Sequence, residues 1–138
     1  MIVLDTNVLS EALRPAPAAS VRRWMEAQQA ESLFTTTICE AEILYGVALL
    51  RAGRRRTAFE RAVVAIFEDD FAGRILPFDS AAARAFAEIA AVRRRSGRPF
   101  GGFDAQIAAI ARSRGAAVAT RNIDDFAGCG IAVVSPWA

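Results

Sequence analysis

The first fourteen residues, MIVLDTNVLSEALR (residues 1–14), place a carboxylate at the end of an apolar run. Residues 2–4 are apolar and partly β-branched, which is typical of a strand that is covered on both faces. Asp5 follows at once, and a short apolar helical pattern continues over residues 6–13. In open α/β sheets, ligands bind in the crevice outside the carboxyl ends of the strands. Asp5 is therefore either a helix cap or the first residue of a site.

The rest of the chain alternates short apolar runs with helical patterns. Further strands are expected at residues 33–36, 75–78, 117–119 and 131–134, and Pro77 places the second of these at a sheet edge or ends it early. Helices are expected at residues 21–30, 38–53, 55–71, 80–95 and 104–114, with Ser20, Thr37 and Asp79 or Ser80 as caps. This alternation predicts one α/β domain over residues 1–138, with an open, mostly parallel sheet covered on both faces.

The composition is that of a globular chain. Apolar residues make up 54% of it, yet no apolar run approaches the roughly 18 residues of a membrane span. Asp5 falls where the apolar core of a signal peptide would have to lie, so we expect a cytoplasmic protein that has no membrane partner. Two cysteines are too few for a disulfide scaffold, and they lack the spacing of metal ligands.

Histidine and lysine are both missing, and all 17 basic residues are arginine. Catalysis therefore cannot use an imidazole base, a Schiff-base lysine or a Walker lysine. Carboxylates, with or without a metal ion, remain for hydrolytic chemistry. The arginines cluster at residues 54–56 and 93–98, which suits a polyanion, although a solvated helix face or a partner's docking surface explains each cluster equally well.

Polar residues follow the ends of two predicted strands. Asp5 follows the first strand, and Thr120, Asn122 and Asp125 follow the strand at 117–119. If these strands are neighbours, Asp5 approaches Asn122 or Asp125 across one crevice.

Glu42 lies in the middle of a predicted helix that is apolar in almost every direction. At 100° per residue, Glu42 shares a face with Gly46, whereas Glu40 points about 160° away, so the two glutamates cannot serve one site. A buried carboxylate needs a partner. For Glu42, that partner is either a ligand or one of the many arginines.

Asp104 begins a helix, with Ile107 and Ala108 as its helical neighbours. It can cap free N–H groups there, or it can lean toward the same crevice as Asp5. Several acids that converge in a crevice repel one another unless they are protonated or neutralised by a cation. Oxygen ligands favour Mg²⁺ or Mn²⁺, and such an ion can activate water without an imidazole. An acidic metal site flanked by arginines suits the hydrolysis of phosphodiester bonds.

Other folds with an aspartate at a strand end fit less well. A response-regulator receiver needs a lysine, and a haloacid-dehalogenase phosphatase usually has a second aspartate where this chain has Asn7. The only Gly-x-Gly, at residues 128–130, precedes a strand and does not open a helix, so it makes a very weak dinucleotide-binding motif.

Four motifs in this order resemble the PIN-domain nucleases, and in particular the VapC/FitB-like toxins of bacterial toxin-antitoxin pairs. They are MIVLDTNVLSE at residue 1, AEILYG around Glu42, FDAQIAAIA from Phe103 and VATRNIDDF from Val118. GVALLRAGRRR from Gly46, FAGRILPFD from Phe71 and the ending VVSPW look especially like the FitB branch. The similarity spans essentially the whole chain.

The resemblance implies a three-layer α/β/α sandwich whose central parallel sheet gathers acidic residues around Mg²⁺ or Mn²⁺. Asp5, Glu42 and Asp104 match the first three acids of the family. The residues that match its supporting polar groups are Thr6, Asn7 and Thr120. The fourth acid falls on Asn122, where the FitB branch is expected to have aspartate. An amide oxygen brings no charge, so Asn122 would ligate a metal more weakly or share the position with Asp125 through water.

The family further implies a metal-dependent endoribonuclease that cuts RNA with metal-activated water and leaves a 5′-phosphate. It implies a homodimer that is inhibited by a small antitoxin, whose C-terminal segment lies in the active-site groove and whose N-terminal part binds promoter DNA. A second hypothesis is a weakly catalytic or non-catalytic subunit of such a DNA-binding complex. A third is a structural domain whose acids are only caps and salt bridges.

Overall fold

The computed structural model describes all residues 1–138, and its centre is a sheet of five parallel strands. The order across the sheet is β3 (Ile75–Leu76), β2 (Leu33–Thr36), β1 (Ile2–Leu4), β4 (Ala117–Ala119) and β5 (Val133–Val134). The first strand in the chain is therefore the central one. Val3 and Leu4 are fully buried, as the continuous apolar run predicts for a strand that is covered on both faces.

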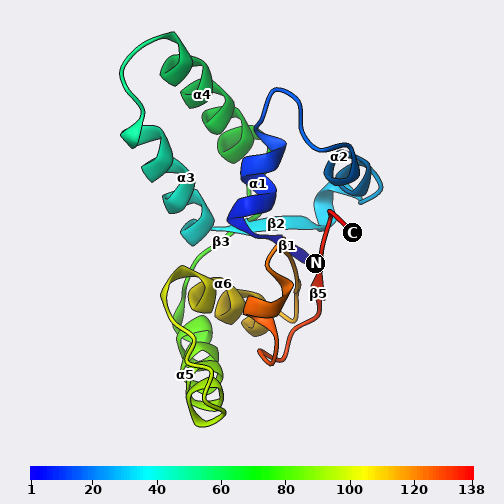
Figure 1. The fold of residues 1–138 in the computed structure, drawn as a ribbon, viewed down its shortest axis with the longest axis vertical. Helices are drawn as coiled ribbons and strands as arrows, with labels where there is room; N and C mark the ends of the chain where they lie inside the picture. The colour runs from blue at the N-terminus through cyan, green and yellow to red at the C-terminus, as the bar shows by residue number, and fades with distance from the viewer.

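Six α-helices cover the sheet. Figure 1 shows α1 (Thr6–Ala12), α2 (Ala19–Glu26), α3 (Thr37–Leu49) and α4 (Arg54–Val64) on one side, and α5 (Ser80–Arg95) and α6 (Gly102–Ser113) on the other. This is the expected three-layer α/β/α arrangement. None of the helices combines the length and the apolar surface that a membrane span would need.

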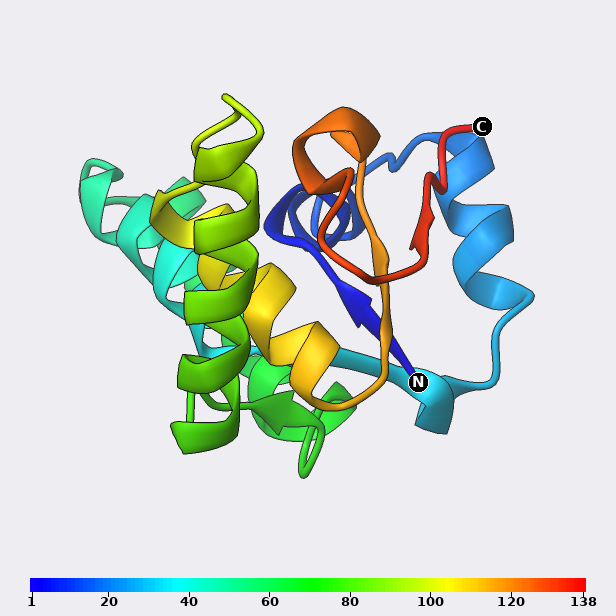
Figure 2. The ribbon, with the colours of Figure 1, turned by 90° about the horizontal axis from the view of Figure 1, so that it is seen from below.

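Helix α6 is the most deeply buried helix, because alanine and isoleucine fill its sheet-facing side. Residues 107–111 are all fully buried. Its end is set by Gly115, which has φ +65°, a conformation that favours glycine. The N–H of Ala116 donates to the carbonyl of Ala111 at 2.9 Å and that of Gly115 to Arg112 at 3.1 Å, which closes the helix and turns the chain into β4. Figure 2 shows this path from α6 into β4, which lies beside β1.

Strands β1 and β4 are direct neighbours. The residues that follow them, Asp5 and the segment from Thr120, can therefore share one crevice, as the sequence predicts for neighbouring strands. Leu4 pairs with Ala119, and the ladder continues beyond both strands, where the N–H of Asp5 donates to the carbonyl of Ala119 at 2.9 Å. Asp5 and Thr120 therefore leave the sheet side by side. The strand expected at residues 75–78 ends at Leu76, before Pro77, and it is an outer strand, so both effects expected of Pro77 are observed.

Several predicted element ends shift by a few residues. Ser20 does not cap α2, because that helix begins at Ala19 and its N-cap position, Ala18, makes no side-chain bond. Helix α3 is capped by Thr36, whose hydroxyl accepts from the N–H of Cys39, and not by Thr37. The helix expected over residues 55–71 ends at Val64 and continues as a wider π-helical turn, Ala65–Asp70.

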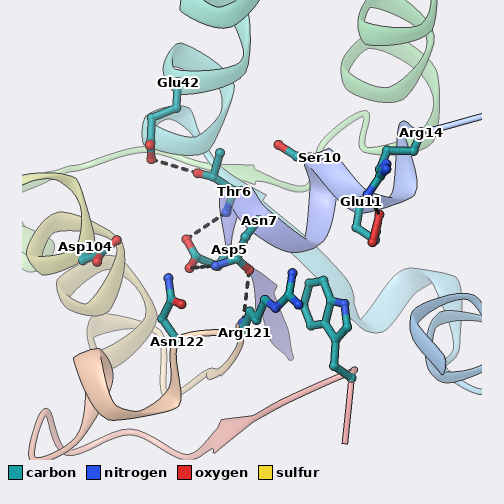
Figure 3. A pocket seen from close by; sticks show the side chains of 11 residues that line it. Asp5, Thr6, Asn7, Ser10, Glu11, Arg14, Glu42, Asp104, Arg121 and Asn122 are labelled. Carbon is teal, nitrogen blue, oxygen red and sulfur yellow. Dashed lines mark hydrogen bonds and ion pairs between the residues drawn. The ribbon is translucent and has the colours of Figure 1, made fainter. Parts of the chain in front are cut away.

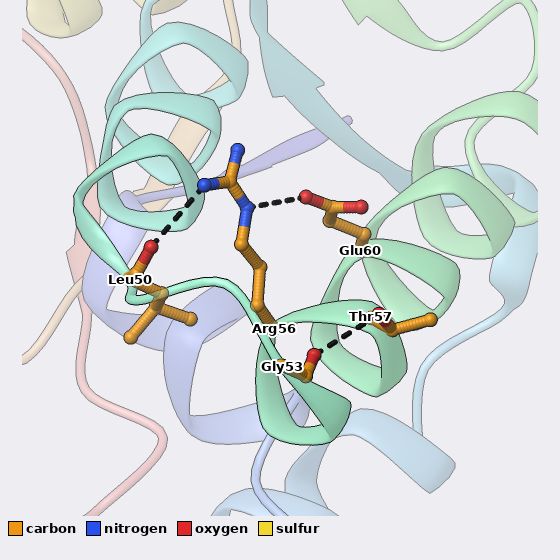
Figure 4. A network of polar contacts seen from close by, with 5 residues as sticks. All are labelled: Leu50, Gly53, Arg56, Thr57 and Glu60. Atoms are coloured by element: carbon orange, nitrogen blue, oxygen red, sulfur yellow. Dashed lines mark hydrogen bonds and ion pairs between the residues drawn. The ribbon is translucent and has the colours of Figure 1, made fainter.

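One arginine of each cluster has a structural role. In the first cluster, Arg56 donates to Glu60 at 2.7 Å and to the carbonyl of Leu50 at 3.2 Å, so it ties α4 to the end of α3 (Figure 4). In the second, Arg93 is only 7% exposed and packs over the ring of Phe100 at 4.5 Å. Arg56 and Arg93 are thus used for packing, whereas Arg54, Arg55, Arg94, Arg95 and Arg98 remain exposed.

Candidate active site

A pocket of about 590 Å³ opens at the carboxyl ends of β1 and β4. Its lining comes from five parts of the chain: the end of β1 with α1, α3, α6, the segment after β4 and the C-terminal end (Figure 3). Eleven residues line it: Asp5, Thr6, Asn7, Ser10, Glu11, Arg14, Glu42, Asp104, Arg121, Asn122 and Trp137. The structure thus brings three of the predicted acids and Asn122 together around one space.

Asp5 is fixed in the centre of this pocket. Its Oδ1 accepts from the N–H of Thr6 at 2.8 Å, which confirms that it caps α1. Its Oδ2 accepts from the hydroxyl of Thr120 at 2.7 Å and from the amide Nδ2 of Asn7 at 3.2 Å. The residue therefore serves both as cap and as pocket wall, and three donors hold its carboxylate in one orientation.

The Asn7 and Thr120 side chains form a small network under Asp5. Asn7 Nδ2 donates to the Thr120 hydroxyl at 3.3 Å, and Asn7 Oδ1 accepts from the N–H of Arg121 at 3.1 Å. The Thr120 hydroxyl also accepts from the N–H of Asn122 at 3.1 Å. This network joins the start of α1 to the segment after β4, so the two halves of the pocket are held in register.

Glu42 is half-buried on α3 and faces the pocket. Its Oε1 accepts from the Thr6 hydroxyl at 2.8 Å. No arginine lies within ion-pair distance of it, so the salt-bridge explanation for Glu42 is wrong. Glu40 does not line the pocket, as its helical angle predicts.

Asp104 lies in the first turn of α6 but does not cap it. The N-cap position is Gly101, and the Asp104 side chain makes no hydrogen bond, so the capping explanation is wrong. Asp104 is half-buried and faces the pocket (Figure 3). Its carboxylate is free to bind something else.

Asn122 lines the pocket, whereas Asp125 does not. Asp125 lies in the short 3-10 turn Ile123–Phe126 and is exposed. Its charge still reaches the site, because it contributes to the raised pKa of Asp104. Of the two alternatives for the fourth position, only Asn122 lines the pocket.

The acids raise one another's pKa because they are partly buried and carry the same charge. Burial raises the pKa of Asp5, against the hydrogen bonds from Thr120 and Thr6, and the charge of Glu42 adds to the rise. Burial and the charge of Asp104 raise the pKa of Glu42, although its bond from Thr6 opposes the rise. Burial and then the charges of Asp5 and Asp125 raise the pKa of Asp104. Such a group of acids favours a proton or a cation.

The donor set fits a hard divalent cation. It contains carboxylate and amide oxygens and neither imidazole nor thiolate, which is the ligand chemistry of Mg²⁺ or Mn²⁺. No three His, Cys, Asp or Glu side chains form a closed coordination shell in this structure.

Five pocket residues were not predicted from the sequence. Ser10, Glu11 and Arg14 follow Asn7 at intervals of three, four and seven residues, so a polar stripe on α1 could have indicated them. Arg121 stands beside Thr120 in a motif that was already singled out. Trp137 stands in the ending VVSPW, which was also singled out, but only the fold brings the end of the chain to this pocket.

Comparison with known proteins agrees with this architecture. A PIN domain model matches residues 2–128, so the chain belongs to the PIN domain family. It is 41% identical over 137 residues to VapC ribonuclease Y4jK of Sinorhizobium fredii, covering 99% of this chain and 98% of that protein. It is 38% identical over 137 residues to toxin FitB of Neisseria gonorrhoeae, covering 99% of each.

Its fold also matches a solved structure of FitAB bound to an IR36 DNA fragment. The TM-score is 0.94 at 38% identity, over 100% of this chain and 96% of that one. The resemblance to VapC/FitB-like toxins is therefore confirmed, and the expected three-layer fold with it.

Proposed function

We propose that this chain is the toxin of a type II toxin-antitoxin pair and acts as an Mg²⁺-dependent endoribonuclease. The observation that carries the proposal is the group of three acids, Asp5, Glu42 and Asp104, which face one pocket without a basic partner. The full-length similarity to a protein named VapC ribonuclease and to toxin FitB supports the same activity.

The chain's own residues have distinct roles in this mechanism. A bound Mg²⁺ would make a coordinated water acidic and neutralise charge on the phosphate that is cut. Asp5 would hold the ion, because its carboxylate is already fixed by three hydrogen bonds. Glu42 and Asp104 would complete its carboxylate ligands, and Asp104, which has no hydrogen-bond partner, could accept the proton that the attacking water releases. Asn122 is the preferred fourth ligand, since it lines the pocket and Asp125 does not.

A groove beside the acids is suited to a segment of a partner protein. A second hollow of about 810 Å³ lies between α1, α3 and α4 and shares four residues with the acidic pocket: Thr6, Ser10, Arg14 and Glu42. Its apolar lining comes from Leu13, Pro15, Ile43, Leu50, Phe59 and neighbouring alanines. An antitoxin segment in this groove would reach the acids, and promoter DNA would be bound through the antitoxin. A homodimer within that complex stays a prediction.

The proposal is tested with the chain separated from its partner and given a structured RNA and Mg²⁺. The Glu42→Gln variant should lose cleavage, and so should the wild type in EDTA. The Glu40→Gln variant is the matched control, because it changes the same residue type on the same helix but outside the pocket, and it should keep cleavage. Equal cleavage in all four samples would contradict a metal-dependent mechanism.

The alternative is a subunit that serves mainly to bind the antitoxin in a DNA-bound complex. The FitAB structure on DNA does not favour it over the nuclease, because an active toxin would be held in the same kind of complex. If the wild-type chain, separated from its partner, cleaves none of a varied set of RNAs at saturating Mg²⁺ and Mn²⁺, that result would contradict the nuclease proposal and favour this one.

A further inference from the structure

We infer that Arg121, positioned by Trp137, binds a backbone phosphate of the nucleic acid next to the acidic cluster. This inference rests on the proposed function, because it assumes that a nucleic acid enters the pocket. It adds a substrate-binding residue to a site whose other described groups are acids and their hydrogen-bond donors.

A free cation at the pocket wall would offset the negative charge that an entering nucleic acid meets. Its lining includes four carboxylates, from Asp5, Glu11, Glu42 and Asp104, and two guanidinium groups, from Arg14 and Arg121. One divalent ion at the acids would offset much of this negative charge, but the phosphates beside the one that is cut would still meet carboxylates. A cation at the pocket wall lowers that repulsion.

Arg121 is the arginine of the pocket that is available. Arg14 already pairs with Glu11 at 3.4 Å. None of the chain's ion pairs includes Arg121, and its guanidinium donates no hydrogen bond within the protein. Its five N–H donors form a planar fork that matches phosphate oxygens.

Two contacts place Arg121 at the pocket although the residue is exposed. Its backbone N–H donates to Asn7 Oδ1, and Asn7 Nδ2 in turn donates to Asp5. Its guanidinium carbon Cζ lies 5.1 Å from the centre of the Trp137 ring, within the range of a cation–π contact. Trp137 packs against the core with its other atoms, so it is a firm support. The backbone bond sets where the side chain begins, and the indole restricts where the guanidinium points.

Binding is measured without cleavage, in the full-length Asp104→Asn background, by anisotropy of a fluorescein-labelled single-stranded RNA of eight nucleotides. Adding Arg121→Gln should weaken binding about fivefold. It should also reduce the slope of log affinity against log salt by about 0.7, the value for one phosphate of a single strand. The same RNA with abasic sites in place of its bases should show the same Arg121 effect.

The matched control is Arg84→Gln, which removes an exposed, unpaired arginine from α5. Asp79, the N-cap of α5, lies 3.7 Å from Arg114 at the end of α6. Arg84 is near this start of α5, whereas Asp104 is at the opposite end of α6, in its first turn. Arg84→Gln should leave the salt slope unchanged. An equal effect of the two substitutions would overturn the inference, and so would loss of the Arg121 effect with abasic RNA, which would indicate base recognition.

Trp137 is tested as a positioning residue. Trp137→Ala should weaken RNA binding, as Arg121→Gln does. Trp137→Phe should keep most of the wild-type affinity, because a phenyl ring also supports a cation–π contact. When Arg121 is already glutamine, Trp137→Ala should have no further effect on the salt slope. An additive effect of the two substitutions would overturn the positioning role. Because these readouts do not require catalysis, a failure of the nuclease proposal would be seen separately, as an inactive wild type.

Discussion

The Thr120 hydroxyl donates to Asp5 Oδ2 at 2.7 Å, between two residues that are 115 positions apart in the chain. Because β1 and β4 are paired in register, these residues leave the sheet side by side. The bond lowers the pKa of Asp5 against the rise caused by burial. It thus favours the charged form that a metal ion needs.

Thr120→Val should weaken Mn²⁺ binding about tenfold, as is usual when a partner of a metal ligand is removed. Without the hydroxyl, the pKa of Asp5 rises further, so the loss should be larger at pH 5.5 than at pH 8. Isothermal titration with Mn²⁺ at both pH values measures this. Thr120→Ser keeps the hydroxyl and should bind nearly as well as the wild type; an equal loss in the two variants would contradict the role of the hydrogen bond.

Asp104→Asn should stabilise the metal-free protein at neutral pH. The folded state raises the pKa of Asp104 by burial and by the charges of Asp5 and Asp125, so it penalises the ionised form. A raised pKa in the folded state gives stability that is present below the unfolded value, near 4, and is lost as pH rises through the folded value. The variant should therefore have a higher Tm than the wild type at pH 7 in EDTA, with the difference shrinking toward pH 4. A lower Tm at pH 7 would show that Asp104 stabilises the fold.

Arg93→Ala should cost about 3 kcal/mol of unfolding free energy, because it leaves several carbonyls without a donor. Arg93 donates to the carbonyls of Arg98, Asp125 and Ala127 and lies over Phe100. Arg94→Ala, one position along the same helix and exposed, should change stability by no more than about 0.5 kcal/mol. Urea denaturation compares them, and similar losses in both would contradict a specific structural role for Arg93.

The sequence was sufficient for the parts of the fold that depend on apolar pattern. The run at Ile2–Leu4 indicated a strand covered on both faces, and the strand has that position at the centre of the sheet. Cap positions were less predictable, since adjacent hydroxyls such as Thr36 and Thr37 offer similar caps. Only the backbone at Thr36, with φ −129° and ψ 159°, decides between them.

The pocket was predictable where a polar residue breaks an apolar pattern, and less so elsewhere. Glu42 stood out because a mid-helix acid on an apolar face needs a partner, and the structure supplies the Thr6 hydroxyl. The contact between Arg121 and Trp137 could not be foreseen, because it joins two loops whose approach depends on the whole sheet. Asp104 looked like a cap from its place near a helix start, but Gly101 holds the N-cap position of that helix instead.

The fourth ligand position gives a separate prediction. Asn122→Asp should tighten Mn²⁺ binding, because it adds a charged oxygen donor at the pocket wall. Asp125→Asn should change Mn²⁺ affinity less than Asn122→Ala does, since Asp125 lies outside the pocket lining. Titration of the three variants tests this, and a larger loss from Asp125→Asn than from Asn122→Ala would assign the fourth position to Asp125.

The most direct test of the metal site is the anomalous diffraction of a crystal of the chain soaked in Mn²⁺. We expect a peak between the carboxylates of Asp5, Glu42 and Asp104, with the Asn122 side chain facing it, and no such peak in a crystal of Glu42→Gln soaked in the same way. A wild-type crystal with no manganese at this pocket, or with manganese bound only elsewhere, would contradict the proposal that these acids hold a catalytic ion.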